Sequence, residues 1–453
     1  MFHKIITYWN LHKFPILFAI VSILLYTSFA YDLDRKDFTK LITLFAGLFF
    51  FCYKLIQFEK WNFRFLVITG IIFRLIFLGA TPNLSQDFFR FIWDGNLIVQ
   101  GLNPYLHLPI DLIAQEDFSL NKAQQLVVGM GELSASNYSN YPPLNQFIFA
   151  ISSLLSGKSI AGSLLIMRVF IILADIGILY FGRLLLLKLN KPVHLIFWYF
   201  LNPLIILELT GNLHFEGVML FFFIWSMYLL HNKKWKIAAP IYAMSIAVKL
   251  VPIIFLPLFI KHLGLKKSLV FYSLVAGVSV LFFFPFFSVQ FLENYAQTIG
   301  LWFSNFEFNA GLYNLVKHIA VSFDAKPWEL IKVYGKITPP IVITVVGLFT
   351  FLADNKKTPT LFTSMVWILS IYYLLATTVH PWYIVFLVLT CLFTDLKHPL
   401  IWSFFVFLSY WTYSNPDYKE HKIILIVEYI AIYGFMLYEI IKAYNKKTIF
   451  RKI

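Results

Sequence analysis

Two carboxylates and an arginine follow a hydrophobic stretch at helical spacing, between Ser85 and Tyr105. Asp87, Arg90 and Asp94 share one helical face when the segment is read at ~100° per residue. The neighbouring apolar face carries Phe88, Phe91, Ile92, Gly95 and Val99. Such a helix typically lies in a membrane interface with its charged groups toward water. We therefore expect this rim to be where a lipid-borne and a water-borne substrate react.

Structural explanations exist for the same charged residues. Asp87 and Arg90 stand one helical turn apart and could simply pair with each other. Asp94 could hold the turn at Gly95 rather than take part in chemistry. A carboxylate within hydrogen-bond distance of a hydroxyl is, however, well suited to act as a general base.

Further polar residues are expected at the same end of the protein. Polar side chains close to a bilayer are costly, so each calls for a reason, which is either mutual pairing that holds helices together or a site. The residues are Tyr141 with Pro142 and Pro143, His214, Glu216, Lys249, Asn309, His380, Trp382 and Tyr383.

Each of these positions allows two interpretations. Lys249 stands between AMSIAV and LVPIIF with no acid nearby in sequence, so it either extends toward the interface or binds a phosphate at a break between two half-helices. His214 and Glu216 could cap a helix start, and HPWY at 380–383 could belong to an aromatic belt. Arg168 and Asp175 are predicted to form a structural pair.

The composition indicates an all-α polytopic membrane protein. Of 453 residues, 59% are hydrophobic and only 13% are charged, against about 25% charged in soluble domains. Lys and Arg (37) outnumber Asp and Glu (23), but they gather in short loops between apolar runs, which is the positive-inside pattern and excludes a nucleic-acid partner. Cys52 and Cys391 lie within apolar runs and are predicted to be packed thiols.

The apolar runs predict about 14 transmembrane helices with both chain ends cytoplasmic. This register requires that 237–262 is broken near Lys249–Pro252 and that 144–157 does not cross. The first span is expected to be retained, because no small-residue cleavage motif follows it. The loops 81–161 and 288–337 are then outside, and the first carries amphipathic juxtamembrane helices. The predicted runs are 15–31, 40–56, 64–80, 162–187, 193–210, 214–231, 237–262, 268–287, 338–353, 360–378, 382–394, 399–413 and 423–441.

Several motifs resemble the GT-C superfamily of integral-membrane glycosyltransferases, in particular its bacterial branch that uses polyprenyl-phosphate-mannose. They are DFFRFIWDG at 87–95, GLNPY at 101–105, YPPLNQ at 141–146, HFEG at 214–217, AVKLVP at 247–252 and HPWY at 380–383. The resemblance covers about 64–413, which leaves 1–63 as two accessory helices and 414–453 as a last helix with a basic tail. Relatives often have two adjacent acids where this chain has Gln86 and Asp87. A two-carboxylate metal site is thus disfavoured here, although Mg²⁺ or Mn²⁺ binding stays open.

The resemblance implies a polyprenyl-phosphate-sugar donor, a glycan or glycolipid acceptor and inversion at the anomeric carbon, on the outer side of a bacterial inner membrane. Asp87 would remove the acceptor proton, with Arg90 and Asp94 beside it. Lys249, His380 and Arg90 would meet the donor phosphate. Mannose is favoured by resemblance alone. The residues expected to contact substrate are Trp93, Tyr105, Tyr141, His214, Glu216, Asn309 and Trp382.

Two other classes are considered. A transporter or flippase keeps charged residues near the midplane, often in an inverted repeat, and no repeated half is evident in the sequence. A polysaccharide polymerase is expected to have its large outer loop in the later half, whereas the acid-rich loop comes early in this chain. The clustering of the candidate residues at one rim favours an enzyme.

Overall fold

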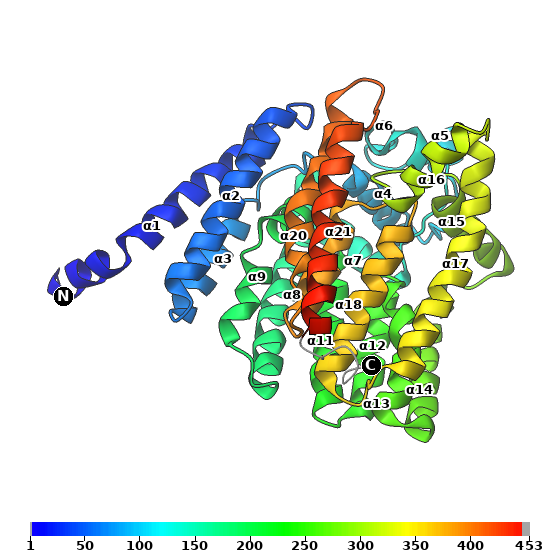
Figure 1. Ribbon diagram of the computed structural model, residues 1–453. Helices are drawn as coiled ribbons and strands as arrows, with labels where there is room; N and C mark the ends of the chain where they lie inside the picture. The colour runs from blue at the N-terminus through cyan, green and yellow to red at the C-terminus, as the bar shows by residue number, and fades with distance from the viewer. Residues whose placement is uncertain (1, 446–453) are drawn as a thin grey trace.

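The computed structural model describes residues 2–445, which fold into a bundle of helices (Figure 1). Within this range the only extended pairing is an isolated parallel bridge between Phe308 and Thr378. The predicted all-α polytopic fold is therefore confirmed.

Seven of the described helices are long and apolar enough to cross a membrane. An eighth span is formed if the bent pair 193–200 and 203–211, which turns by 48°, counts as one. Each coincides with a predicted run, and the predicted total of about 14 stays a prediction. The seven are α1 Phe2–Tyr31, α2 Phe38–Glu59, α8 Ile160–Lys188, α14 Leu265–Phe283, α17 Pro327–Leu352, α18 Thr358–Leu375 and α21 Lys422–Asn445.

Shorter elements complete the bundle, some of them 3₁₀ or π turns labelled η. The bent pair consists of η1 Val193–Ile196, α9 Phe197–Phe200, α10 Pro203–Ile205 and η2 Ile206–Gly211. The short apolar elements are α7 Pro143–Leu155, α11 Glu216–His231, α12 Trp235–Val248, η3 Val251–Leu258, α13 Phe259–Leu263, η5 Pro381–Tyr383 and α19 Ile384–Cys391. The others are α3 Phe63–Leu75, α4 Asp87–Val99, α5 Pro109–Ile113, α6 Ala123–Ala135, η4 Phe284–Phe286, α15 Val289–Ser304, α16 Leu312–Val321, α20 His398–Phe405 and η6 Val406–Ser414.

Loops predicted to share one side of the membrane lie at one end of the bundle. Lys191, after α8, donates from Nζ to the Thr394 carbonyl, 2.8 Å away and after α19. His231, at the end of α11, lies 2.9 Å from the Thr358 hydroxyl at the start of α18. In Figure 1 the α13–α14 turn and the end of α21 lie at this same lower end. These loops, which the register places inside, thus gather at one end of the bundle.

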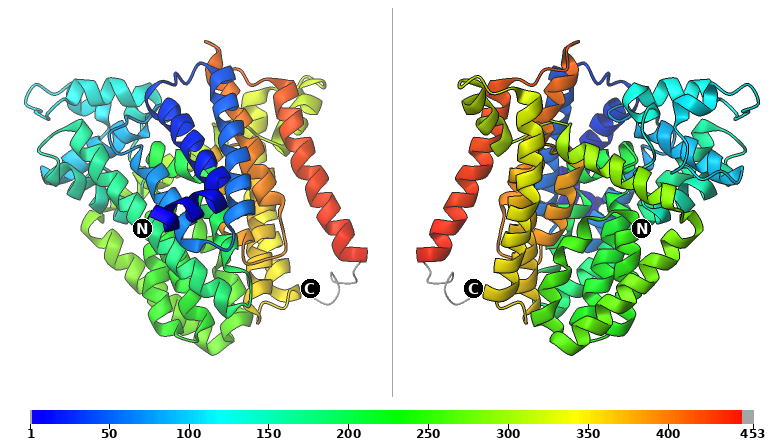
Figure 2. Two further views of the ribbon diagram at one scale, coloured as in Figure 1. Left: turned by 90° about the vertical axis from the view of Figure 1, so that its left-hand side faces the viewer. Right: turned by 90° about the vertical axis from the view of Figure 1, so that its right-hand side faces the viewer.

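Helices of the two predicted outer loops cover the opposite end. Figure 2 shows the segment with α4, α5 and α6 extending sideways from this end. Asn121, between α5 and α6, donates to the Lys158 carbonyl 2.8 Å away, so the end of α7 lies beside the α5–α6 connection. This arrangement agrees with the expectation that residues 144–157 do not cross the membrane. Which end of the bundle lies outside stays a prediction.

The predicted helix of the acid-rich segment is confirmed as α4, but its expected exposure is wrong. Arg90 and Asp94 are buried at 3% and 0% exposure, because α6 and α7 pack over the face that carries them. At Gly95 a Cβ would lie only 2.3 Å from the Phe149 carbonyl oxygen of α7. Only glycine permits this close approach of the two helices.

The predicted pair of Arg168 with Asp175 is also wrong. Seven residues of helix separate them by about 10.5 Å along the axis. Asp175 instead accepts from Arg74 of α3, whose Nε lies 2.8 Å from Oδ2. Arg168 donates to the carbonyls of Thr210 and Gly211 at 2.8 and 3.2 Å. Both arginines therefore hold helices together, as expected for charges within a bundle.

Candidate active site

A cavity of about 670 Å³, called the main cavity below, lies where α4, α11, the end of α12 and η5 meet. Seven of the predicted site residues line it, from segments far apart in the chain. They are Asp87, Arg90, Tyr141, Glu216, Lys249, His380 and Trp382. The other five, Trp93, Asp94, Tyr105, His214 and Asn309, do not line it. The structure thus divides the predicted set into residues facing the cavity and residues behind its walls.

Asp87 opens α4 at the edge of the main cavity. Burial raises the pKa of its carboxyl above the ordinary value of 3.8, and nearby Glu216 adds to the rise. Lys249 and a hydrogen bond from the Tyr141 side chain act in the opposite direction. A carboxylate with a raised pKa accepts a proton more readily than an ordinary aspartate, which suits a general base.

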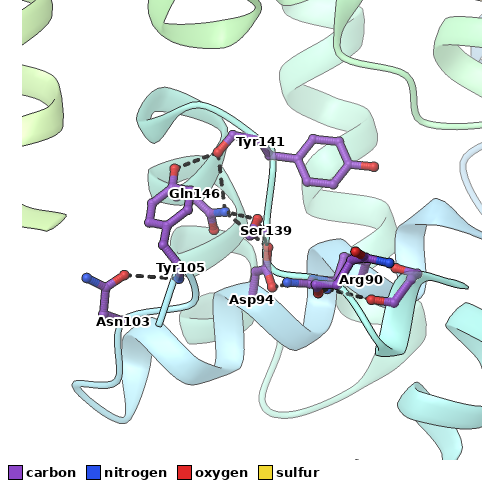
Figure 3. A network of polar contacts seen from close by, with 9 residues as sticks. Arg90, Asp94, Asn103, Tyr105, Ser139, Tyr141 and Gln146 are labelled. Carbon is purple, nitrogen blue, oxygen red and sulfur yellow. Dashed lines mark hydrogen bonds and ion pairs between the residues drawn. The ribbon is translucent and has the colours of Figure 1, made fainter. Parts of the chain in front are cut away.

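Arg90 pairs with Asp94, and not with Asp87 as one interpretation of the sequence allowed (Figure 3). Its Nε lies 2.7 Å from Asp94 Oδ1, and its Nη1 donates to two backbone carbonyls of the α6 end, Ser134 and Asn137, both at 2.8 Å. Its Nη2 is buried without a hydrogen-bond partner among the described residues. Arg90 also lines the main cavity, so this donor without a protein partner belongs to a residue of the cavity wall.

Asp94 is engaged within the protein. Besides Arg90, it accepts hydrogen bonds from Ser139 Oγ at 2.5 Å and from Gln146 Nε2 at 3.0 Å. Figure 3 shows these groups gathered around the carboxylate. Asp94 therefore orients Arg90 and joins α4 to α7, and the expected cap at Gly95 is not formed by its side chain.

Tyr105 and Trp93, both predicted to contact substrate, lie in the protein interior. Tyr105 is fully buried against Phe286 and Phe291, and its hydroxyl donates to the Tyr141 carbonyl at 2.5 Å. Figure 3 shows this carbonyl turned toward Tyr105 while the Tyr141 ring points away from the network. Trp93 has no exposed surface. Tyr105 thus holds the backbone of Tyr141 in place through a hydrogen bond from the protein interior.

The extended residue Lys249 ends α12, as the predicted break requires, with φ −148° and ψ 140°. Its Nζ lies 2.6 Å from Glu216 Oε1 at the start of α11, although no acid stands near it in sequence. The Lys249 side chain keeps 24% exposure in the main cavity, and Glu216 Oε2 has no hydrogen-bond partner among the described residues. Lys249 is therefore the member of the pair that is exposed in the cavity, while the second oxygen of Glu216 is buried beside it.

Four rings from three segments stack beside the main cavity. Phe308, His380, Trp382 and His214 follow one another with centroid separations of 4.7, 4.3 and 3.9 Å. Burial and Lys249 lower the pKa of His380 to about 3, and the same causes lower that of His214. His380 is therefore uncharged at neutral pH, with a buried Nδ1 that has no partner among the described residues. It can offer a hydrogen bond but no positive charge.

Asn309 lies behind this wall and ties it to α21. Its Nδ2 donates to Glu428 Oε1 at 3.1 Å, and its carbonyl accepts from the Tyr429 hydroxyl at 2.6 Å. The preceding residue, Phe308, exchanges backbone hydrogen bonds with Thr377 and Val379 at 3.0 and 2.8 Å. Asn309 thus holds the segment that carries His380, and its contact with substrate stays a prediction.

Arg35 lines the main cavity and was missed in the sequence. It lies between α1 and α2, in a part of the chain that we expected to be accessory. Its guanidinium lies 4.2 Å from the ring centre of Tyr413 and donates to the Leu84 carbonyl at 3.3 Å. One feature of the sequence could have indicated Arg35. The positive-inside pattern expects basic residues in inner loops, and Arg35 is a basic residue in a loop that this pattern places outside.

No group of three or more His, Cys, Asp or Glu side chains suited to a metal ion occurs within residues 2–445. The carboxylates that face the main cavity, Asp87 and Glu216, come from different elements, and one of them is paired with Lys249. The described side chains therefore supply no preformed metal centre.

Comparison with known proteins gives one family. The family model described as alpha-(1->6)-mannopyranosyltransferase, N-terminal domain (MptA_B family), matches residues 30–264, just over half of the chain. The chain belongs to this family. The match contains Arg35, Asp87, Arg90, Glu216 and Lys249, and so most of the charged groups of the main cavity. The resemblance to GT-C mannosyltransferases inferred from the motifs is confirmed.

A relative from Corynebacterium glutamicum, alpha-(1->6)-mannopyranosyltransferase B, is 26% identical over 144 residues. The matched segment is 32% of this chain and 23% of that protein. The comparison thus spans about a quarter of the relative's length.

Proposed function

We propose that this MptA_B family member is a membrane mannosyltransferase that moves a sugar from a polyprenyl-phosphate donor to a hydroxyl of a glycan or glycolipid acceptor. The observation that carries the proposal is the main cavity, which brings the Asp87 carboxylate together with the cations Lys249 and Arg90 at one end of an apolar bundle. The name of the family supports mannose as the sugar.

In the proposed reaction the acceptor oxygen attacks the anomeric carbon of the donor. The bond from that carbon to the phosphate oxygen breaks, and the electron pair leaves with the polyprenyl phosphate. Asp87 takes the hydroxyl proton. Lys249 Nζ and Arg90 Nη2 stabilise the charge that develops on the phosphate, and His380 adds an N–H donor. A direct displacement of this kind inverts the anomeric configuration.

The lining of the main cavity supports a lipid donor. Its lining at η3 and α15 is mostly apolar and consists of Leu250, Val251, Ile254, Thr298, Ile299 and Leu301. A prenyl chain can pack there while its phosphate reaches Lys249, which directly precedes this lining in the chain. The basic loops gather at the far end of the bundle, which supports an active site on the outer face.

Transport or lipid flipping is the alternative. A transporter or flippase would need charged groups along a path across the membrane. The charged groups of the main cavity instead lie together with a candidate base at one end of the bundle. A direct test is to incubate membranes with labelled polyprenyl-phosphate-mannose and an acceptor glycan. Label in the glycan only when the protein is present supports transfer. Label that changes sides while still on its carrier would instead support flipping.

A further inference from the structure

A second pocket of about 520 Å³, called the outer pocket below, adjoins the main cavity. Three segments supply most of its lining: 33–36 before α2, 81–86 before α4, and the stretch at Tyr413 and Tyr418 before α21. The helices α4 and α6 complete it with Phe88, Phe89 and Gly129. All three segments belong to the end of the bundle that carries Asp87. The polar residues of its lining are Asp34, Arg35, Lys36, Thr81, Asn83, Ser85 and Gln86, and its tyrosines are Tyr413 and Tyr418.

The outer pocket shares a wall with the main cavity. Arg35, Ser85, Gln86, Tyr413 and Tyr418 line both. Gln86 directly precedes Asp87 in the chain, and the Ser85 hydroxyl accepts a hydrogen bond from the Asp87 backbone N–H at 3.3 Å. A group bound in the outer pocket therefore lies next to the candidate base.

The lining combines aromatic rings with polar groups, beside the apolar residues Leu33, Pro82, Phe88 and Phe89. Tyr413 and Tyr418 lie edge to face with ring centres 6.1 Å apart, and Tyr418 keeps 60% exposure. Aromatic faces combined with polar groups bind ligands that have one apolar face and many hydroxyls. Asp34, Thr81 and Gln86 are exposed beside these rings, and Arg35 adds donors.

We infer that the outer pocket binds the glycan part of the acceptor and presents its hydroxyl to Asp87. The inference rests on the proposed transferase function and adds the place of its second substrate. The lipid donor reaches Asp87 along the mostly apolar lining at η3 and α15, and the hydrated acceptor reaches it between the connecting segments. The helix pair α1 and α2 thus contributes to the site through Arg35 and Asp34, beyond the accessory role expected from the sequence.

A labelling experiment tests binding without requiring turnover. Both native thiols, Cys52 and Cys391, are buried, so a Thr81→Cys variant has one accessible cysteine. We expect an alpha-(1->6)-linked mannotetraose to slow maleimide labelling of this cysteine several-fold in purified protein. Glu116→Cys, exposed beyond α5 and outside the pocket, is the matched control and should label at the same rate with and without glycan.

Kinetics give an independent readout. Tyr418→Ala should raise the KM for the acceptor by roughly three- to ten-fold, the worth of one aromatic contact, and change the KM for the donor less than that. Trp61→Ala, which removes an exposed aromatic far from the pocket between α2 and α3, should change neither value.

Different results would overturn the transferase function and the glycan site in the outer pocket. Protection of Thr81→Cys by glycan without any transfer of labelled mannose would keep the glycan site and overturn the transferase function. Transfer with no protection and an unchanged acceptor KM in Tyr418→Ala would keep the transferase and overturn the acceptor site.

Discussion

The Lys249 ammonium and the Glu216 carboxylate form an ion pair of 2.6 Å across the main cavity wall, joining the end of α12 to the start of α11. The two residues are 33 positions apart in the sequence, so the sequence alone did not predict their pairing. Glu216 holds the cation at the cavity and keeps an unpaired oxygen of its own. In the proposed reaction, the pair therefore fixes the position of the positive charge that the donor phosphate meets.

Lys249→Met should weaken donor binding and slow transfer, because a phosphate at the cavity loses its cation. Lys249→Arg should keep part of the activity, since the charge persists while its shape changes. Donor-concentration dependence of transfer is the measurement. Lys249→Met also leaves Glu216 without its partner, so the double variant Lys249→Met with Glu216→Gln is the control for folding. Unchanged donor kinetics in Lys249→Met would remove this residue from the site.

Asp87→Asn should lower turnover by about 10²–10⁴-fold, the usual contribution of a general base, while the protein stays folded. Asp94→Asn is expected to act on stability, because it leaves the buried Arg90 without its carboxylate. Loss of one partner of a buried pair costs about 3–5 kcal/mol of unfolding free energy. Thermal unfolding in detergent and initial transfer rates separate the two effects. Near wild-type turnover in Asp87→Asn would move the base elsewhere, with Glu216 as the next candidate.

The pH dependence of transfer should reflect the raised pKa of Asp87. A general base works when deprotonated, so the rate should fall with decreasing pH through a pKa above 3.8. Lys249 lowers this pKa and Glu216 raises it, so Lys249→Met should move the acid limb to higher pH and Glu216→Gln to lower pH. Rate profiles of the two single variants against wild type measure both shifts. Parallel shifts in one direction would contradict the assignment.

His380 should contribute no titration near neutral pH, because its pKa is about 3 and it is uncharged above that value. His380→Gln should lower the transfer rate by removing a ring N–H donor but keep the shape of the profile between about pH 5 and 8. Loss of a limb in that range on this substitution would show that the imidazole carries charge during turnover.

The membrane orientation can be tested with cysteines at exposed positions. Ser136→Cys and Lys158→Cys flank α7, and Lys356→Cys lies between α17 and α18 at the other end of the bundle. An impermeant maleimide added outside intact cells should label the first two and spare the third. Labelling of Lys158→Cys only from the cytoplasmic side would mean that α7 crosses, and the proposed outer active site would fall with it.

The sequence by itself determined the membrane class, the positions of the long helices and the motifs of the site. Each long helix coincides with a predicted apolar run, because hydrophobic length is a local property of the chain. The break at Lys249 followed from the membrane register that the basic loops require, and the cavity-lining residues Asp87, Arg90, Glu216, Lys249 and His380 lie in motifs visible without coordinates.

Only the tertiary structure decided which charged side chains form ion pairs with one another. Arg90 pairs with Asp94 and not with Asp87, because α6 and α7 bury the face of α4 that carries them. Asp175 pairs with Arg74 of another helix and not with Arg168 of its own helix. Tyr105 faces the protein interior, and Arg35 reached the main cavity from a loop about 50 residues before α4. Spacing along one helix limits the possible neighbours, but the packing of distant helices selects among them, since burial makes each unpaired charge costly.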